Sequence, residues 1–210
     1  SVIIHEVGHN FFPMIVNSDE RQWTWMDEGL NTFLQYLAEQ ELSPTYPSQR
    51  GPAAKIVPYM SGPQDFLEPI MSNSETIHQF GANAYAKPAT GLNILRETIM
   101  GKELFDYAFK TYANRWKFKH PTPEDFFRTM EDASAVDLDW FWRGWFYSTD
   151  YVDIGIQDVK EYFVSADAPK ETKDVNIRKG RFNKEDGPFV YMVSADSDKN
   201  NIKPLDVNNI

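Results

Sequence analysis

The chain lacks cysteine altogether, and this absence limits the kinds of metal site that it can build. Without Cys, a disulfide framework and a thiolate metal site are both excluded, so a bound metal would need His, Asp, Glu or water as ligands. Lys and Arg are also scarce, at 21 residues against 31 Asp and Glu, and the formal net charge is -10. Phosphate recognition needs clustered positive charge, so the composition predicts no nucleic-acid partner.

Long apolar runs and a signal-peptide pattern are absent as well. No stretch approaches the ~18 consecutive apolar residues of a membrane-spanning helix, which predicts no membrane span in this chain. The sequence opens with Ser1 inside an apolar stretch, so we expect an N-terminally truncated piece of a longer polypeptide. The chain does contain 41% hydrophobic and 15% aromatic residues, enough for a sizeable folded core.

The spacing of apolar residues and helix breakers predicts a mainly α fold. Pro13 should end a short, buried helix over residues 2–12. High Pro and Gly density over residues 43–79 predicts short helical turns joined by loops. Thr122 and Pro123 are typical of a helix start, because Thr can cap the helix and Pro suits its first position. Longer helices are expected over residues 24–42, 88–100, 103–117 and 122–133, and from Asp137 onward.

A change of pattern near residue 150 predicts a division of the chain into two parts. Residues 1–150 are expected to form a helical lobe. After Tyr151, short β-like runs separated by charged turns predict a β-containing C-terminal extension over residues 151–210. The aromatic residues from Trp140 to Tyr147 cover nearly all faces of one helix, which favours core packing over a ligand-binding surface.

The strongest chemical signal is the sequence His5-Glu6-Val7-Gly8-His9, an H-E-x-x-H motif. On a helix, the four-residue spacing places both imidazoles on one face, one turn apart, where they can bind a single ion. Glu6 then lies beside the metal, in a position to accept a proton from water. Catalytic zinc usually has three protein ligands, and Glu28 follows His9 after 18 intervening residues, enough for a loop and a returning helix.

These residues resemble the aminopeptidase N-like zinc metallopeptidases, which share H-E-x-x-H, 18 residues, and then Glu in a Trp-x-x-Glu-Gly setting. Trp25 and Glu28 match that setting, and Tyr85-Ala86-Lys87 looks like the family's Tyr-x-Lys element. The resemblance covers residues 1–150, including a later helical stretch over residues 126–140. It implies the helical lobe of a thermolysin-like catalytic domain, with one Zn²⁺ per chain held by His5, His9 and Glu28.

The resemblance also implies catalytic roles for Glu6 and Tyr85. Glu6 would act as general base and Tyr85 would stabilise the charge that develops on the scissile carbonyl oxygen. The family usually has Gly after the Lys, whereas this chain has Pro88, so the helix is expected to start later and Tyr85 to lie differently. Tyr59 is the second candidate for this role.

Some questions stay open at this level. Either Asp27 or Thr32 could orient the metal ligands.

The family's β-rich lobe and its amine-binding glutamate lie upstream of the zinc helix, outside this chain. Release of N-terminal amino acids from a peptide substrate is therefore an implication of the resemblance, and a thermolysin-like endopeptidase and a non-catalytic scaffold remain as alternatives. Localisation is open as well, with family habit favouring an exported enzyme.

Overall fold

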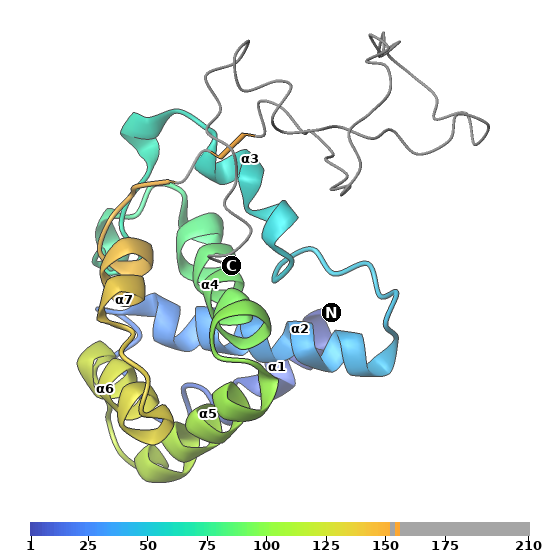
Figure 1. Ribbon diagram of the computed structural model, residues 1–210, viewed down its shortest axis with the longest axis vertical. Coiled ribbons are helices and arrows are strands. Elements are labelled where there is room, and N and C mark those ends of the chain that lie inside the picture. Colours follow the sequence, from blue (N-terminus) through green and yellow to red (C-terminus); the bar gives the residue numbers. More distant parts are fainter. Residues whose placement is uncertain (152–153, 156–210) are drawn as a thin grey trace, which may run out of the picture. The chain divides into compact units, whose positions relative to one another are not determined.

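The computed structural model describes residues 1–151, 154 and 155, which form helices joined by turns and loops (Figure 1). The described residues contain no β-strand, only an isolated bridge between Val16 and Lys119. The predicted mainly α fold is confirmed, whereas the predicted β-containing extension lies almost wholly outside the described residues. The α-helices are α1 (Val2–Gly8), α2 (Leu30–Leu42), α3 (Val57–Met60), α4 (Lys87–Ile94), α5 (Lys102–Trp116), α6 (Pro123–Ser134) and α7 (Asp139–Phe146).

Several tighter and wider helical turns supplement these elements. Three short 3-10 turns occur in the Pro- and Gly-rich region, as predicted for residues 43–79. Wider π-helical turns adjoin α2 and α4, and such turns are frequent at functional sites. The 3-10 turns are Ala53–Lys55, Gln64–Phe66 and Ser74–Thr76, and the π-helical segments are Trp25–Gly29, Gly81–Ala86 and Leu95–Ile99.

α6 begins as its sequence predicts. The Thr122 hydroxyl accepts a hydrogen bond from the Asp125 backbone N–H, and the Asp125 carboxylate accepts one from the Thr122 N–H, which together form a capping box. α7 begins at Asp139, two residues after the start that was expected at Asp137. The Asp137 carboxylate accepts a hydrogen bond from the Asp139 N–H at 3.1 Å. At the start of both α6 and α7, a side chain accepts a hydrogen bond from an N–H group that has no partner within the helix.

Pro88 does not delay the helix, contrary to the expectation from sequence. Lys87 has helical angles (φ -64°, ψ -47°), and α4 follows the π-helical segment Gly81–Ala86 directly. Pro88 is the second residue of α4. Its ring also packs against Gly29, where an added Cβ would lie 2.6 Å from the Pro88 Cγ. Tyr85 therefore lies on a continuous helical segment.

Aromatic rings around Trp25 form much of the core. The Trp25 ring centroid lies 4.9 Å from that of Phe146 and 5.7 Å from those of Phe126 and Phe127. These contacts fasten the segment that carries Glu28 to α6 and α7. The predicted packing role of the aromatic α7 is confirmed for its buried members, whereas Trp140 is 61% exposed. The buried residues of α7 are Phe141, Trp142 and Phe146.

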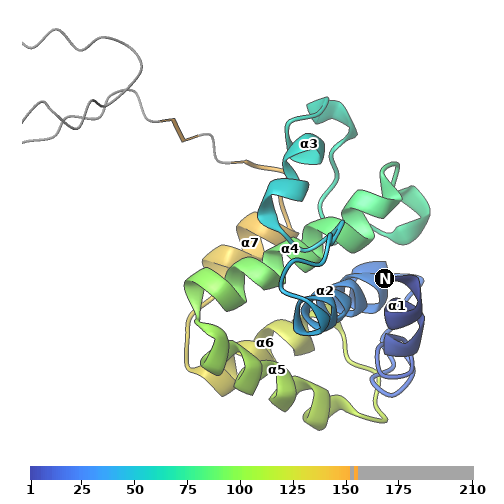
Figure 2. The same ribbon diagram turned by 90° about the vertical axis from the view of Figure 1, so that its right-hand side faces the viewer.

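α1 packs against α2, and α2 also contacts α4 (Figure 2). The expectation of a buried first helix was wrong, because α1 ends at Gly8 and the side chains of Val2, Ile3 and Val7 are 68%, 80% and 64% exposed. Only the face that carries His5 turns inward, toward α2. None of the described helices is both long and apolar enough to cross a membrane.

Candidate metal centre

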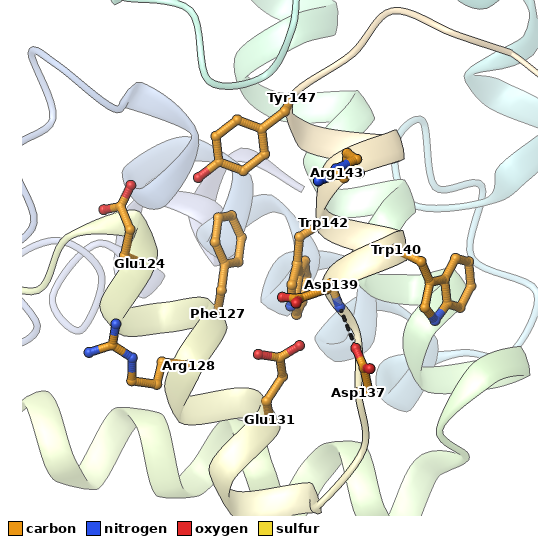
Figure 3. Close-up of a pocket in the computed structure, with 10 residues that line it drawn as sticks. All are labelled: Glu124, Phe127, Arg128, Glu131, Asp137, Asp139, Trp140, Trp142, Arg143 and Tyr147. Atoms are coloured by element: carbon orange, nitrogen blue, oxygen red, sulfur yellow. Dashed lines mark hydrogen bonds between the residues drawn. The ribbon is translucent and has the colours of Figure 1, made fainter.

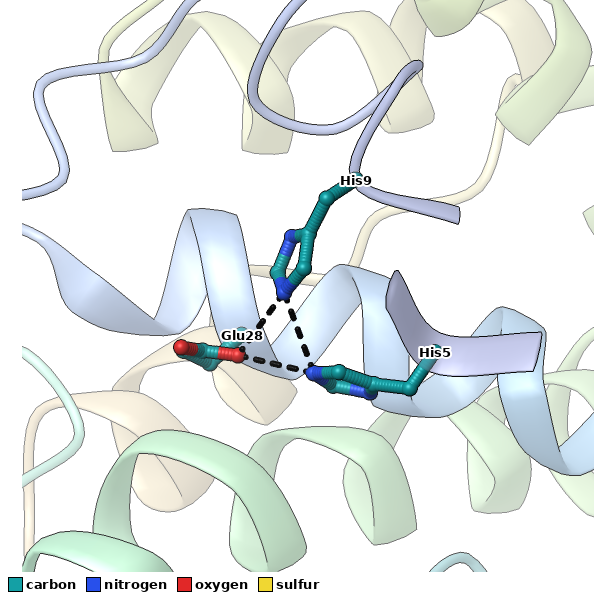
Figure 4. A group of neighbouring side chains, drawn as sticks. All are labelled: His5, His9 and Glu28. Atoms are coloured by element: carbon teal, nitrogen blue, oxygen red, sulfur yellow. Dashed lines mark hydrogen bonds and ion pairs between the residues drawn. The ribbon is translucent and has the colours of Figure 1, made fainter. Parts of the chain in front are cut away.

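The imidazoles of His5 and His9 and the carboxylate of Glu28 meet at one point (Figure 4). The His5 Nε2 lies 3.0 Å from the Glu28 Oε2 and 3.1 Å from the His9 Nε2, and the His9 Nε2 lies 3.3 Å from the same carboxylate oxygen. His5 lies on α1, His9 directly follows α1, and Glu28 comes from the π-helical segment before α2. All three side chains are largely buried, with 10% to 20% of their surface exposed.

A chain of hydrogen bonds fixes the orientation of the His5 ring. The His5 Nδ1 lies 2.9 Å from the Gln35 Oε1, and the Gln35 Nε2 donates to the Glu39 Oε1 at 2.8 Å. The Ser48 hydroxyl donates to the other Glu39 oxygen at 2.6 Å. Because a carboxylate only accepts, the Gln35 amide must turn its oxygen toward His5, so the His5 Nδ1 carries the proton.

Two acceptors surround the second nitrogen of His9. Its Nδ1 lies 2.9 Å from the Phe12 carbonyl oxygen and 3.0 Å from the Asp27 Oδ1. Because the Phe12 carbonyl oxygen can only accept a hydrogen bond, this nitrogen carries the proton. Burial, together with the neighbouring Glu28 carboxylate, raises the pKa of Asp27 to about 7.

The donor set fits a zinc ion. With both Nδ1 atoms protonated, the two Nε2 lone pairs and the Glu28 oxygen face one another at about 3 Å, an arrangement that a cation between them stabilises. Two imidazoles and one carboxylate are a known ligand set of catalytic zinc, which keeps a fourth position for water or substrate. Acceptors on the outer ring nitrogens are also typical of metal-bound histidines.

A cleft of about 450 Å³ opens onto these three residues, and it is lined by Glu6 and Tyr85 as well. The Tyr85 ring stacks against the His5 ring, with 5.9 Å between centroids and 21° between planes. Burial and then the Glu28 carboxylate raise the pKa of Tyr85, so its hydroxyl stays a hydrogen-bond donor at neutral pH. Tyr59, the second candidate, is not among the residues that line the cleft.

A larger cavity of about 830 Å³ lies between α6 and α7 (Figure 3). Three of its carboxylates, those of Glu131, Asp137 and Asp139, come close enough to one another to suggest a cation site. The Glu131 Oε1 already accepts from the Leu138 N–H at 2.8 Å, and the Asp137 Oδ1 accepts from the Asp139 N–H. The carboxylates of Glu131 and Asp137 therefore hold the turn into α7, and the histidine-containing group is the better candidate centre.

Sequence reasoning missed two residues that support the ligands. Gln35 and Asn31 follow Glu28 by seven and three positions, a spacing that places them on the same helical face, so the signal was present. Of the two residues expected to orient the ligands, Asp27 lies beside His9. The Thr32 hydroxyl is buried and makes no hydrogen bond to any described residue.

Comparison with known proteins gives a consistent result. The model of the peptidase family M1 domain matches residues 1–145. Aminopeptidase 2, mitochondrial, of Saccharomyces cerevisiae is 24% identical over 143 residues, which are 65% of this chain and 15% of that protein. Probable aminopeptidase 1 of Sulfurisphaera tokodaii is 25% identical over 173 residues, 78% of this chain and 22% of its own length. Glutamyl aminopeptidase of Rattus norvegicus is 29% identical over 141 residues, 64% of this chain and 15% of its own length.

The chain thus spans about a fifth or less of the length of these relatives. The match nevertheless covers nearly all of the described residues and includes His5, His9, Glu28, Glu6 and Tyr85. The chain belongs to peptidase family M1.

Proposed function

We propose that the protein is a zinc-dependent peptidase that releases N-terminal amino acids from peptides, with one zinc ion held by His5, His9 and Glu28. The observation that carries this proposal is the convergence of the His5 Nε2, the His9 Nε2 and one oxygen of Glu28. Acceptors bound to the Nδ1 atoms of both imidazoles leave the Nε2 lone pairs directed toward this point. The three relatives compared above are all named as aminopeptidases, which favours the removal of terminal residues.

The side chains around the zinc would divide the work of amide hydrolysis. When bound, zinc supplies Lewis-acid chemistry, lowering the pKa of water and polarising a carbonyl. Glu6 lines the cleft and would accept the proton of the attacking water and return it to the leaving amine. Tyr85, protonated at neutral pH, would donate a hydrogen bond to the carbonyl oxygen as negative charge develops there.

We also propose that residues 1–150 form the helical lobe of the catalytic domain and residues 151–210 an extension of it. The β-rich lobe implied by the family resemblance would cover the outer face of α1. The exposed side chains of Val2, Ile3 and Val7 support this, since contiguous apolar surface of this kind usually marks a contact with another part of a protein.

A metal and activity assay tests the proposal. We expect one zinc per chain and chelator-sensitive cleavage of aminoacyl substrates with a free amine, but not of their N-acetylated forms. Glu6→Gln should keep the zinc and lower turnover by about 10²- to 10⁴-fold, because it removes the general base. Glu41→Gln, an exposed change near the end of α2, serves as the matched control.

The other outcomes are informative. Cleavage of the N-acetylated substrates would identify an endopeptidase instead. Equal rates for the parent and Glu6→Gln would refute the proposed chemistry and leave a non-catalytic scaffold.

A further inference from the structure

A positively charged side chain, Arg50, lines the cleft that opens onto the metal ligands. Its Cζ lies 4.4 Å from the centroid of the Tyr85 ring, a cation–π contact. The His5 imidazole also stacks on Tyr85, with 5.9 Å between the ring centroids. The guanidinium group and a proposed metal ligand therefore contact the same aromatic ring.

The donors of Arg50 are not engaged by the rest of the described chain. Within residues 1–151, no carboxylate forms an ion pair with Arg50, and its guanidinium makes no hydrogen bond. Stacking on Tyr85 uses the face of the guanidinium and leaves the N–H groups at its edge free to bind a ligand. Arg96 provides a contrast, since its guanidinium donates to both oxygens of Asp106.

Hydrogen bonds to α2 hold the loop that carries Arg50 in place. Ser48, two residues earlier, is 6% exposed and donates to the Glu39 carboxylate at 2.6 Å. It also accepts a hydrogen bond from the Gln40 Nε2 at 3.1 Å. Because Glu39 also anchors Gln35, the loop and the His5 ring share one support, and Arg50 is positioned before any ligand arrives.

We propose that Arg50 binds a carboxylate of the peptide substrate and makes the enzyme prefer peptides that present one near the scissile bond. This inference rests on the proposed peptidase function. A guanidinium fork matches a carboxylate with two parallel hydrogen bonds. One extended residue spans at most about 3.6 Å, so a carboxylate one residue from the scissile bond can lie within reach of a group that lines the same cleft as the proposed metal ligands.

Charge complementarity supports the same conclusion. A divalent cation at the centre would be balanced by the carboxylates of Glu28 and Glu6, both of which line the cleft. The charge of Arg50 then has no partner among the lining residues. A substrate carboxylate would provide that partner.

The carboxylate could be the C-terminus of a short peptide or an acidic side chain on either side of the scissile bond. Three dipeptide pairs, each differing by one carboxylate-to-carboxamide change, distinguish these sources: Ala-Ala with Ala-Ala-NH₂, Ala-Glu-NH₂ with Ala-Gln-NH₂, and Glu-Ala-NH₂ with Gln-Ala-NH₂. We expect the zinc-loaded parent to show a kcat/KM at least about tenfold higher for the carboxylate member of one pair, roughly the effect of one charge-assisted contact.

Arg50→Gln should bring that ratio close to one, and Arg50→Lys should leave an intermediate ratio because it keeps the charge but loses the fork. Arg115→Gln, a substitution in α5 of an arginine outside the cleft, should leave the ratio unchanged. The ratio is the decisive readout, because a loss common to both members of every pair would mean that Arg50 only positions Tyr85, and that result would overturn the proposal.

A calorimetric measurement separates this inference from the proposed function. The zinc-loaded Glu6→Gln protein is titrated with each dipeptide, so that binding is measured while turnover is slowed. Tighter binding of one carboxylate member, lost in Glu6→Gln/Arg50→Gln, supports the proposal even if the parent hydrolyses nothing. Equal binding within every pair overturns it even if the parent is an active peptidase.

Discussion

The side-chain amide of Asn31 donates a hydrogen bond of 2.7 Å to the main-chain oxygen of His5. Asn31 lies in the first turn of α2, three residues after Glu28, so the helix that follows Glu28 holds the helix that carries His5 and precedes His9. The same side chain explains Gly8 of the H-E-x-x-H motif. A Cβ at Gly8 would lie 2.0 Å from the Asn31 Oδ1, so the amide and a larger residue cannot occupy this space together.

This relationship predicts a coupled pair of substitutions. Asn31→Ala should destabilise the protein by about 0.5–1.5 kcal/mol, because it removes one of the two hydrogen bonds to the His5 carbonyl oxygen, the other being donated by the His9 N–H at 3.2 Å. Gly8→Ala should also destabilise it, by about 1–3 kcal/mol, through overpacking. The double variant should lose less than the sum of the two, since removing the amide makes room for the methyl group.

Urea denaturation of the four proteins, each with its metal removed, measures this coupling. Asn114→Ala, which affects an exposed residue on α5, is the control for removing an asparagine side chain. Strictly additive free energies of unfolding would show that the two residues do not compete for the same space.

Gln35 should control zinc affinity through His5. Gln35→Leu keeps the size of the side chain but removes the acceptor that fixes the His5 ring, and substitutions of this kind typically weaken metal binding by about 10- to 100-fold. Competition with a chromophoric chelator gives the affinity directly. Gln40→Leu, on the same helix but bonded to Ser48, should have a much smaller effect. Equal zinc affinities for the two variants would show that Gln35 does not orient the ligand.

Tyr85 and Tyr59 can be distinguished by the same substitution at each position. Tyr85→Phe should lower kcat by about 10²- to 10³-fold while zinc content stays at one per chain, because a donor to the developing oxyanion is commonly worth about 2.7–4 kcal/mol. Tyr59→Phe should leave kcat near the parent value, since its hydroxyl is buried, has no hydrogen-bond partner among the described residues and lies outside the cleft. The reverse result would move the catalytic role to Tyr59.

The convergence of His5, His9 and Glu28 could be predicted from sequence because the His5–His9 spacing and the Trp-x-x-Glu-Gly setting depend on local helical geometry. The Thr122 cap was predictable for the same reason. The exposure of Val2, Ile3 and Val7 could not be predicted, since the sequence of an apolar helix is the same whether its outer face is covered or open.

The expectation of a later helix start at Pro88 was wrong for a non-local reason. The steric preference of proline acts on the preceding residue, whereas the packing of Pro88 against Gly29 involves a segment almost 60 positions away. The position of Arg50 in the cleft also depends on a contact between segments, because the Ser48 hydroxyl two residues earlier is bound to the Glu39 carboxylate of α2.

A last prediction concerns Lys87, which is only 2% exposed and donates a hydrogen bond to the Ser148 carbonyl oxygen at 3.2 Å. Burial lowers the pKa of its ammonium group to about 8, although the nearby Asp150 opposes this shift. The unfolded chain holds the proton up to its ordinary pKa of about 10.4, so between pH 8 and 10 the unfolded state binds more protons than the folded state. The free energy of unfolding should therefore rise with pH in this window, by at most about 3 kcal/mol.

The window closes near pH 10, because burial raises the pKa of Tyr112 in the folded protein and the unfolded chain then loses its tyrosine protons first. Urea denaturation of the chelator-treated protein at intervals from pH 7.5 to about 10 measures the effect. Lys87→Met has no charge to bury and should abolish the rise, whereas Lys110→Met, an exposed position on α5, should retain it. A parent protein whose stability is flat or falls across this window would show that Lys87 keeps its proton in the fold, with Asp150 and the Ser148 carbonyl compensating for its burial.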